Sequence, residues 1–102
     1  MLKVMSLMKR KDGMSFADYR SWIMNDHPKL AMQMPGLRGY RVNAPEKENP
    51  DSPYDSISEM WFDNAEARAA AMATDAGKAA GGDAAAHCSS RFHFLVEEKV
   101  LI

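Results

Sequence analysis

The chain lacks the features of disulfide-linked, membrane-spanning and nucleic-acid-binding proteins. Cys88 is the only cysteine in 102 residues, so no disulfide can form within the chain, which fits a reducing cytoplasm. The apolar stretch in residues 1–13 is far shorter than the about 20 residues of a membrane span, and no small-residue cleavage site follows it. The net charge is -1, without the clustered positive excess of a nucleic-acid site. We therefore predict a cytoplasmic protein that binds neither nucleic acid nor membrane.

Motifs for metals and cofactors are also missing. No GxG or GxxxxGK glycine loop is present, so we expect no nucleotide cofactor. His87 and Cys88 are adjacent, and adjacent residues rarely chelate one ion, so we expect no zinc site. Cys88 as a nucleophile would need an activating base, and a position next to His87 in the sequence does not ensure contact in space. The prediction is a protein without metal or cofactor, in which Cys88 is an ordinary thiol.

The length predicts one domain over residues 1–102, because single cores usually occupy about 100 to 150 residues. A core of this size leaves little room for a deep cavity, so a large pocket would need walls from a second subunit. Nine methionines are many for this length. They either fill an adaptable core or form a soft lining for an apolar ligand. Those on predicted core faces are Met5, Met8, Met24, Met34 and Met60.

The hydrophobic pattern predicts the element order β-α-β-β-α-β. We expect strands over residues 2–9, 37–44, 54–62 and 91–100. We expect one helix over residues 16–34 and a second from Asn64, broken by Gly77 and Gly81-Gly82 into about 10 helical residues and a looser piece. This is the split βαβ order of ferredoxin-like α+β domains, in which two helices cover one face of a four-stranded antiparallel sheet.

The predicted strands are apolar on both faces, although the helices can cover only one. A single layer would leave hundreds of Å² of apolar surface exposed, which soluble monomers avoid. We therefore expect a homodimer in which two sheets pack into a dimeric α+β barrel. The apolar residues 100–102 would reach onto the neighbouring subunit.

His27 is the most informative residue, because it falls on the apolar stripe of the first predicted helix. At about 100° per residue, His27 projects on the same face as Phe16, Tyr19, Ile23, Leu30 and Met34. A histidine there is either a proton carrier or a core residue with satisfied hydrogen bonds. Pro28 removes a backbone donor inside this helix, so we expect a distortion centred on residues 24–28.

Two further polar residues, Tyr40 and Glu59, come from the second and third strands and could converge with His27. Tyr40 is otherwise a strand aromatic with its hydroxyl at the edge, and Glu59 otherwise faces solvent or pairs with Arg41. If His27 and Tyr40 meet in one pocket, they form a proton donor and acceptor suited to enolisation, isomerisation or dehydration without a cofactor.

Three segments resemble the EthD family, named for ethyl tert-butyl ether degradation: MSFADYRSWIMNDHPKL, MPGLRGY and the pair Trp61-Phe62. The resemblance implies a dimeric α+β barrel. In a similar branch, the methylmuconolactone methylisomerases, lactones are rearranged without cofactor, and His27 and Tyr40 match positions of that pocket. Met60 stands where that branch has a cysteine, which argues against the same isomerisation. Other similar proteins are polyketide cyclases and fungal decarboxylases or dehydratases, with quinone-forming and haem-degrading monooxygenases more distant.

These observations lead to one main functional hypothesis and two alternatives. The main one is a cofactor-independent isomerase, lyase or cyclase acting on a small apolar ring compound, with His27 as general acid/base and Tyr40 as hydrogen-bond donor. The predicted substrate contacts are Trp61, Glu59, Met60, Tyr19 and Ile23. The alternatives are a non-catalytic accessory protein that binds a similar ligand, and a monooxygenase-like enzyme.

Overall fold

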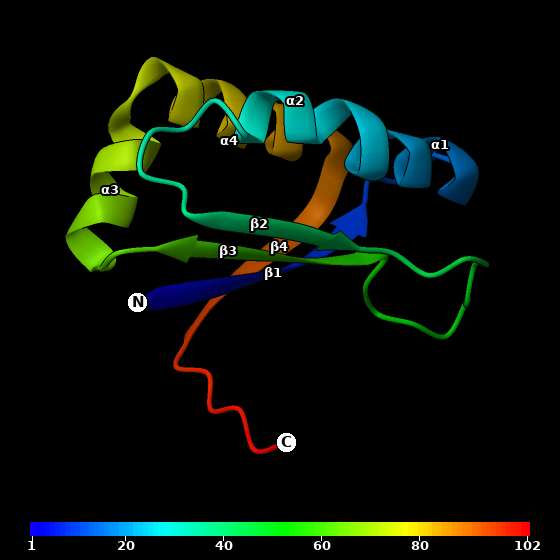
Figure 1. Ribbon diagram of the computed structural model, residues 1–102. Coiled ribbons are helices and arrows are strands. Elements are labelled where there is room, and N and C mark those ends of the chain that lie inside the picture. The colour runs from blue at the N-terminus through cyan, green and yellow to red at the C-terminus, as the bar shows by residue number, and fades with distance from the viewer.

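The computed structural model describes residues 1–102 as a four-stranded antiparallel sheet with its helices on one face (Figure 1). The strands are β1 (Leu2–Arg10), β2 (Gly39–Asn43), β3 (Ser56–Phe62) and β4 (Cys88–Val96). The helices are α1 (Phe16–Ser21), the π-helical turn η1 (Trp22–Asp26), α2 (His27–Ala31), α3 (Ala65–Ala73) and α4 (Asp75–His87). The strand order is β2-β3-β1-β4, so the predicted α+β ferredoxin-like fold is confirmed.

The strand register fixes which side chains face the helices. Ser6 on the central strand β1 lies opposite Ser58 on β3 and His93 on β4, and these three point toward the helices. Met5, the next residue along β1, lies opposite Glu59 and Phe94. Because successive side chains of a strand alternate between faces, Glu59 and Phe94 lie on the face that no helix covers.

The first helical segment is interrupted by η1, close to the distortion predicted from Pro28. Ser15 caps α1 by accepting a hydrogen bond from the Asp18 amide at 3.1 Å, as its position predicts. In η1 the His27 amide donates to the Trp22 carbonyl, five residues back. Pro28, with no amide hydrogen, cannot continue the regular pattern. The distortion predicted at residues 24–28 is thus found slightly earlier, at 22–26, and the predicted helix end at residue 34 is wrong, since α2 stops at Ala31.

The second helical region is more regular than the prediction of a broken helix. Asn64 caps α3, and Thr74 ends α3 and caps α4 through the Gly77 amide. Gly77 sits in the first turn of α4, where a side chain would overlap the carbonyl oxygen of Ala71. Glycine at this position therefore allows α3 and α4 to pack closely and does not end the helix. None of the helices is long and apolar enough to cross a membrane.

The hydrophobic core forms two clusters on the helix-covered face. The first contains Val4, Ala31, Met34, Phe62 and Ala71, and the second contains Met8, Tyr19, Trp22, Ile23 and Ala84. The strand bounds differ most from prediction at β4, which begins at Cys88 and ends at Val96. Residues 97–102 follow without regular structure and run away from the sheet (Figure 1).

Candidate functional site

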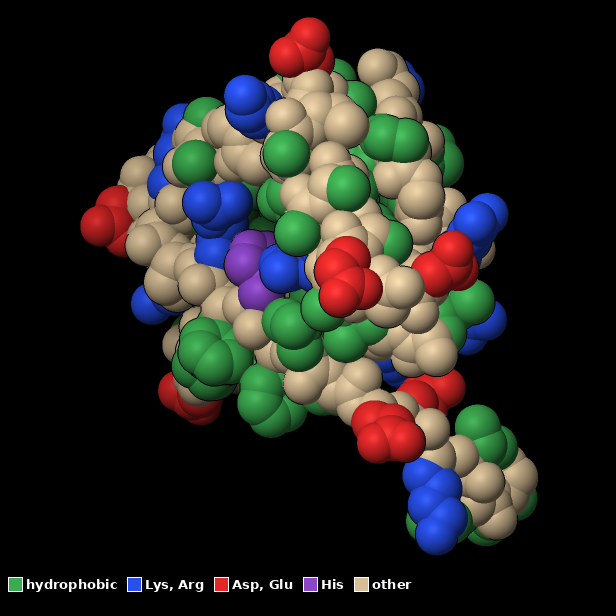
Figure 2. All heavy atoms as spheres, turned by 90° about the vertical axis from the view of Figure 1, so that its left-hand side faces the viewer, with side chains coloured by type: hydrophobic (Ala, Val, Ile, Leu, Met, Phe, Trp, Pro, Cys, Tyr) green, Lys and Arg blue, Asp and Glu red, His purple; other side chains and the backbone are tan.

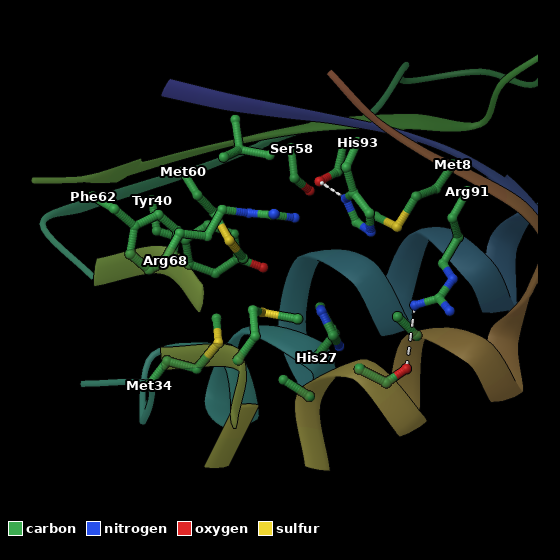
Figure 3. A pocket seen from close by; sticks show the side chains of 16 residues that line it. Met8, His27, Met34, Tyr40, Ser58, Met60, Phe62, Arg68, Arg91 and His93 are labelled. Carbon is green, nitrogen blue, oxygen red and sulfur yellow. Dashed lines mark hydrogen bonds between the residues drawn. The ribbon is translucent and has the colours of Figure 1, made fainter. Parts of the chain in front are cut away.

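A cavity of about 60 Å³ lies between the helix-covered face of the sheet and the helices (Figure 3). It takes wall residues from both core clusters, such as Val4 and Phe62 from one and Met8 and Ala84 from the other. Its methionines are Met8, Met34, Met60 and Met72. This arrangement favours the soft-lining interpretation of the methionines, because flexible thioether side chains can move to enlarge a small cavity.

His27 lines the cavity and is held there by a carboxylate. The ring is 6% exposed, and its Nδ1 lies 2.9 Å from Asp83 Oδ2. The Trp22 indole N–H donates to the same oxygen at 3.0 Å. Because a carboxylate can only accept, Nδ1 of His27 carries a hydrogen, and in the neutral ring Nε2 is the basic nitrogen. The ring makes no other hydrogen bond, so Nε2 is available to a ligand.

Asp83 joins the helices α2 and α4 and was missed from the sequence. Its backbone carbonyl also accepts a hydrogen bond from His87 Nδ1 at 2.7 Å. The His87 ring stacks on Trp22, with centroids 4.3 Å apart and planes 11° apart. The expected break at Gly81-Gly82 hid this residue. A carboxylate four residues before a histidine, in an alanine-rich helix, was the available signal.

On the sheet side, the cavity holds polar side chains without partners. The Tyr40 hydroxyl points into the cavity (Figure 3) and makes no hydrogen bond. Burial raises the pKa of Tyr40 to about 12, so the phenol stays protonated and can donate at neutral pH. Ser58 is 2% exposed, and its hydroxyl is also unpartnered. His27 and Tyr40 therefore line one cavity, as the main hypothesis requires.

His93 lies on the sheet side of the same cavity, with His27 on the helix side (Figure 3). The hydroxyl of Ser6 lies 2.9 Å from His93 Nδ1. Burial, and then the charges of Arg68 and Arg91, lower the pKa of His93. This ring is therefore uncharged at neutral pH.

Of the five predicted substrate contacts, the structure places only Met60 on the cavity wall. Glu59 and Trp61 lie on the opposite face of the sheet, where Glu59 pairs with Lys3 at 2.8 Å and the Lys3 ammonium lies 4.9 Å from the Trp61 ring centroid. Tyr19 and Ile23 are fully buried in the core and do not line the cavity. The prediction mixed the two faces of β3, because alternate residues of a strand point in opposite directions.

Two arginines on the cavity wall were also missed from the sequence. Arg68 comes from α3 and Arg91 from β4, and no aspartate or glutamate lines the cavity. In Figure 2 a histidine lies in a hollow with positively charged side chains on both sides of it. Sequence reasoning missed these arginines because they are far apart in the chain, and only the fold brings both to one cavity.

The structure shows no grouping of three or more histidine, cysteine, aspartate or glutamate side chains that could hold a metal ion. Cys88 is a half-buried free thiol. Its burial raises the pKa of the thiol above the usual value, which disfavours the nucleophilic thiolate. The polar side chains that line the cavity include His27, His93, Tyr40, Ser58 and the two arginines.

Comparison with solved structures places the chain among ferredoxin-like proteins. It is similar to an ethyl tert-butyl ether degradation (EthD) family protein from Bacillus halodurans c-125, with 28% identity, a TM-score of 0.81 and coverage of 97% of this chain and 99% of that chain. A dimeric ferredoxin-like protein of unknown function from Bacteroides fragilis NCTC 9343 is 20% identical, with a TM-score of 0.72 and coverage of 95% of both chains. SnoaB from Streptomyces nogalater, a cofactor-independent oxygenase, is 12% identical, with a TM-score of 0.68 and coverage of 98% of this chain and 95% of that chain.

A comparison with curated proteins finds no match. The model of the EthD domain family matches residues 11–88. These residues include α1 to α4 and the three strands β2, β3 and the start of β4, with His27, Tyr40, Arg68 and Asp83 among them. The match covers most of the sequence, so the chain belongs to the EthD domain family.

Proposed function

We propose that the protein is a cofactor-independent enzyme of isomerase, lyase or cyclase type that acts on a small apolar ring compound in this cavity. The observation that carries the proposal is the hydrogen bond between His27 Nδ1 and Asp83. It fixes the ring orientation and leaves Nε2 as a base at the wall of a cavity that also holds a phenol, Tyr40, which remains a donor. SnoaB, with the same fold, acts without a cofactor, so the fold is compatible with such chemistry.

The proposed reaction begins with removal of a proton next to a carbonyl group. Nε2 of His27 takes the proton, and the Asp83 carboxylate stabilises the imidazolium that forms. The Tyr40 hydroxyl donates to the oxygen on which the enolate charge develops. The imidazolium then returns the proton to a different atom in an isomerisation, or to a leaving group in an elimination.

The first test replaces the base and keeps the shape of the cavity. In a screen of lactones and phenolic ketones, His27→Gln should lower kcat by about 100-fold or more, the usual contribution of a general base. Ligand affinity, measured by ligand-detected NMR, should change little. If the wild type turns over none of these compounds but binds them, the accessory-protein alternative replaces the proposal; if turnover requires dioxygen, the monooxygenase-like alternative does.

Asp83 is a positioning residue in this proposal, because it acts through His27. Asp83→Asn should lower kcat by about 100-fold and leave KM nearly unchanged, because an amide can hold the ring in the wrong tautomer. It should also change the pH profile of kcat, which a purely structural role would not do. The matched control is Asp63→Asn, since Asp63 pairs with Arg38 on the surface. Equal effects of the two substitutions would contradict the proposed role.

We further propose that the protein is a homodimer in which the two uncovered sheet faces pack against each other. Phe92 and Phe94 on this face are 57% and 54% exposed. An exposed apolar sheet face of this kind favours association. Structural neighbours of similar fold are described as dimeric, including the protein from Bacteroides fragilis and one from Thermobifida fusca yx. In this arrangement the exposed residues 100–102 would contact the partner subunit.

A further inference from the structure

The cavity wall carries two arginines and no aspartate or glutamate, and the Asp83 carboxylate behind His27 is held by His27 and Trp22. Neither Arg68 nor Arg91 forms an ion pair. The Arg91 guanidinium donates only to the carbonyl oxygen of Gly81, at 3.2 Å, which leaves most of its five N–H donors free. The Arg68 guanidinium makes no hydrogen bond. Both guanidinium groups are therefore available to a ligand.

Of the four other arginines, Arg10 and Arg38 form ion pairs, with Glu48 and Asp63. Arg20 donates to the Pro45 carbonyl and Arg41 lies over the Trp61 ring, both without an ion pair. The two arginines on the cavity wall have no such partner, although Arg68 is half-buried and the wall is mostly apolar. A cation beside an apolar wall loses part of its hydration, and an anion that accepts hydrogen bonds compensates this loss best.

Two further observations indicate that the missing partner is a ligand in this cavity. The hydroxyls of Ser58 and Tyr40 are buried without a hydrogen-bond partner. Such groups are rare in folded proteins and are normally satisfied by protein, water or ligand. Arg68 and Arg91 both line the cavity that these two hydroxyls line.

We propose that the natural ligand is a small organic carboxylate whose anionic group is bound by Arg68 and Arg91. A planar carboxylate accepts paired hydrogen bonds from guanidinium groups, and the Ser58 hydroxyl can donate to it as well. The apolar part of the ligand lies among the methionines of the cavity. This inference rests on the proposed function and narrows its substrate class, because a fixed carboxylate would hold the ring of the substrate against His27.

The test uses benzoate and its neutral isostere benzamide as probes, with binding measured by ligand-detected NMR at low salt. Benzoate should bind at least about tenfold more tightly than benzamide, as expected for a hydrogen bond between charged groups. Arg68→Gln and Arg91→Gln should each weaken benzoate binding about tenfold and leave benzamide binding unchanged. Arg38→Gln is the matched control and should change neither. Arg68→Lys should restore part of the benzoate affinity, because it keeps the charge and loses the paired donors.

Three results would overturn the inference: equal binding of benzoate and benzamide, unchanged benzoate affinity in both glutamine variants, or displacement of benzoate by equimolar inorganic phosphate. The last result would show a general anion site. The measurement needs no turnover, so failure to find an enzymatic reaction leaves a positive binding result valid. Conversely, loss of the benzoate preference leaves the His27 chemistry to be tested with neutral lactones.

Discussion

The two faces of the sheet differ in how far their polar side chains are paired within the protein. On the uncovered face, Lys3 pairs with Glu59 and Glu98, and Glu59 also accepts a hydrogen bond from Asn43 at 3.1 Å. On the helix-covered face, the hydroxyls of Tyr40 and Ser58 have no partner. Both faces are built from the same strands. Polar groups on the uncovered face stabilise one another, whereas two hydroxyls at the cavity, those of Tyr40 and Ser58, have no partner in the protein.

This contrast separates structural from functional residues within a single strand. Along β3, Ser58 and Met60 line the cavity, whereas Glu59 between them is paired on the other face. Trp61 is likewise placed beneath the Lys3 ammonium. A charged or aromatic residue of the sheet is therefore a candidate for binding in this cavity only if its register places it on the helix-covered face.

The largest expected effect comes from placing a charge on the uncovered face. Phe94→Glu would bury carboxylates in the proposed interface, where a charge costs several kcal/mol, so association should weaken by about 100-fold or more. Sedimentation at micromolar concentration should give a dimer for the wild type and the 11.4 kDa monomer for the variant. Ala85→Glu, on the exposed surface of α4, is the control and should stay dimeric. A wild-type monomer would refute the proposed dimer.

Sequence patterns predicted the features that depend on local chemistry, namely the helix caps and a distortion at Pro28. Ser15 and Asn64 are short polar residues before helical periodicity, and both cap helices. The missing amide of Pro28 predicted a distortion, but the π-helical turn η1 that forms there, with the His27 amide bonded five residues back, was not predictable from the sequence.

The parts that the sequence did not predict depend on contacts between distant segments. His27 and Asp83 are far apart in the chain, and only the packing of α2 on α4 places them 2.9 Å apart. Arg68 and Arg91 reach the cavity from a helix and an edge strand. Glycines normally indicate a helix break, but Gly77 permits a close helix contact here, and the regular α4 that results carries Asp83 to the site.

A pair of tyrosines gives the next largest effect. Removing the unpartnered hydroxyl with Tyr40→Phe should raise the free energy of unfolding by up to about 1 kcal/mol while lowering kcat about tenfold or more. Tyr19→Phe should lower the free energy of unfolding by about 1 kcal/mol, because the Ser56 hydroxyl, 2.7 Å away, loses its buried partner. Urea unfolding and steady-state kinetics measure both. Destabilisation by Tyr40→Phe would show that its hydroxyl is satisfied in solution.

The smallest expected effect separates the two faces by the pH at which each loses stability. The hydrogen bond from Lys3 lowers the pKa of Glu59 below 4.5, so its contribution is present above pH 4.5 and is lost as the pH falls through the folded value. Burial lowers the pKa of His93 below 6.5, so the unfolded chain takes up this proton first and stability is lost as the pH falls below 6.5.

On the helix-covered face, His93→Gln should therefore remove the loss of stability that begins as the pH falls below 6.5. On the uncovered face, Glu59→Gln should remove the loss of stability that begins below pH 4.5. Each change is expected to be on the order of a few tenths of a kcal/mol, because both groups keep contact with solvent. Urea unfolding at pH 7.5, 5.5 and 3.5 covers both windows. If the two variants remove the loss of stability over the same pH range, the two faces do not titrate independently. The contrast between a face whose polar groups pair with one another and a face that binds a ligand then has no electrostatic support.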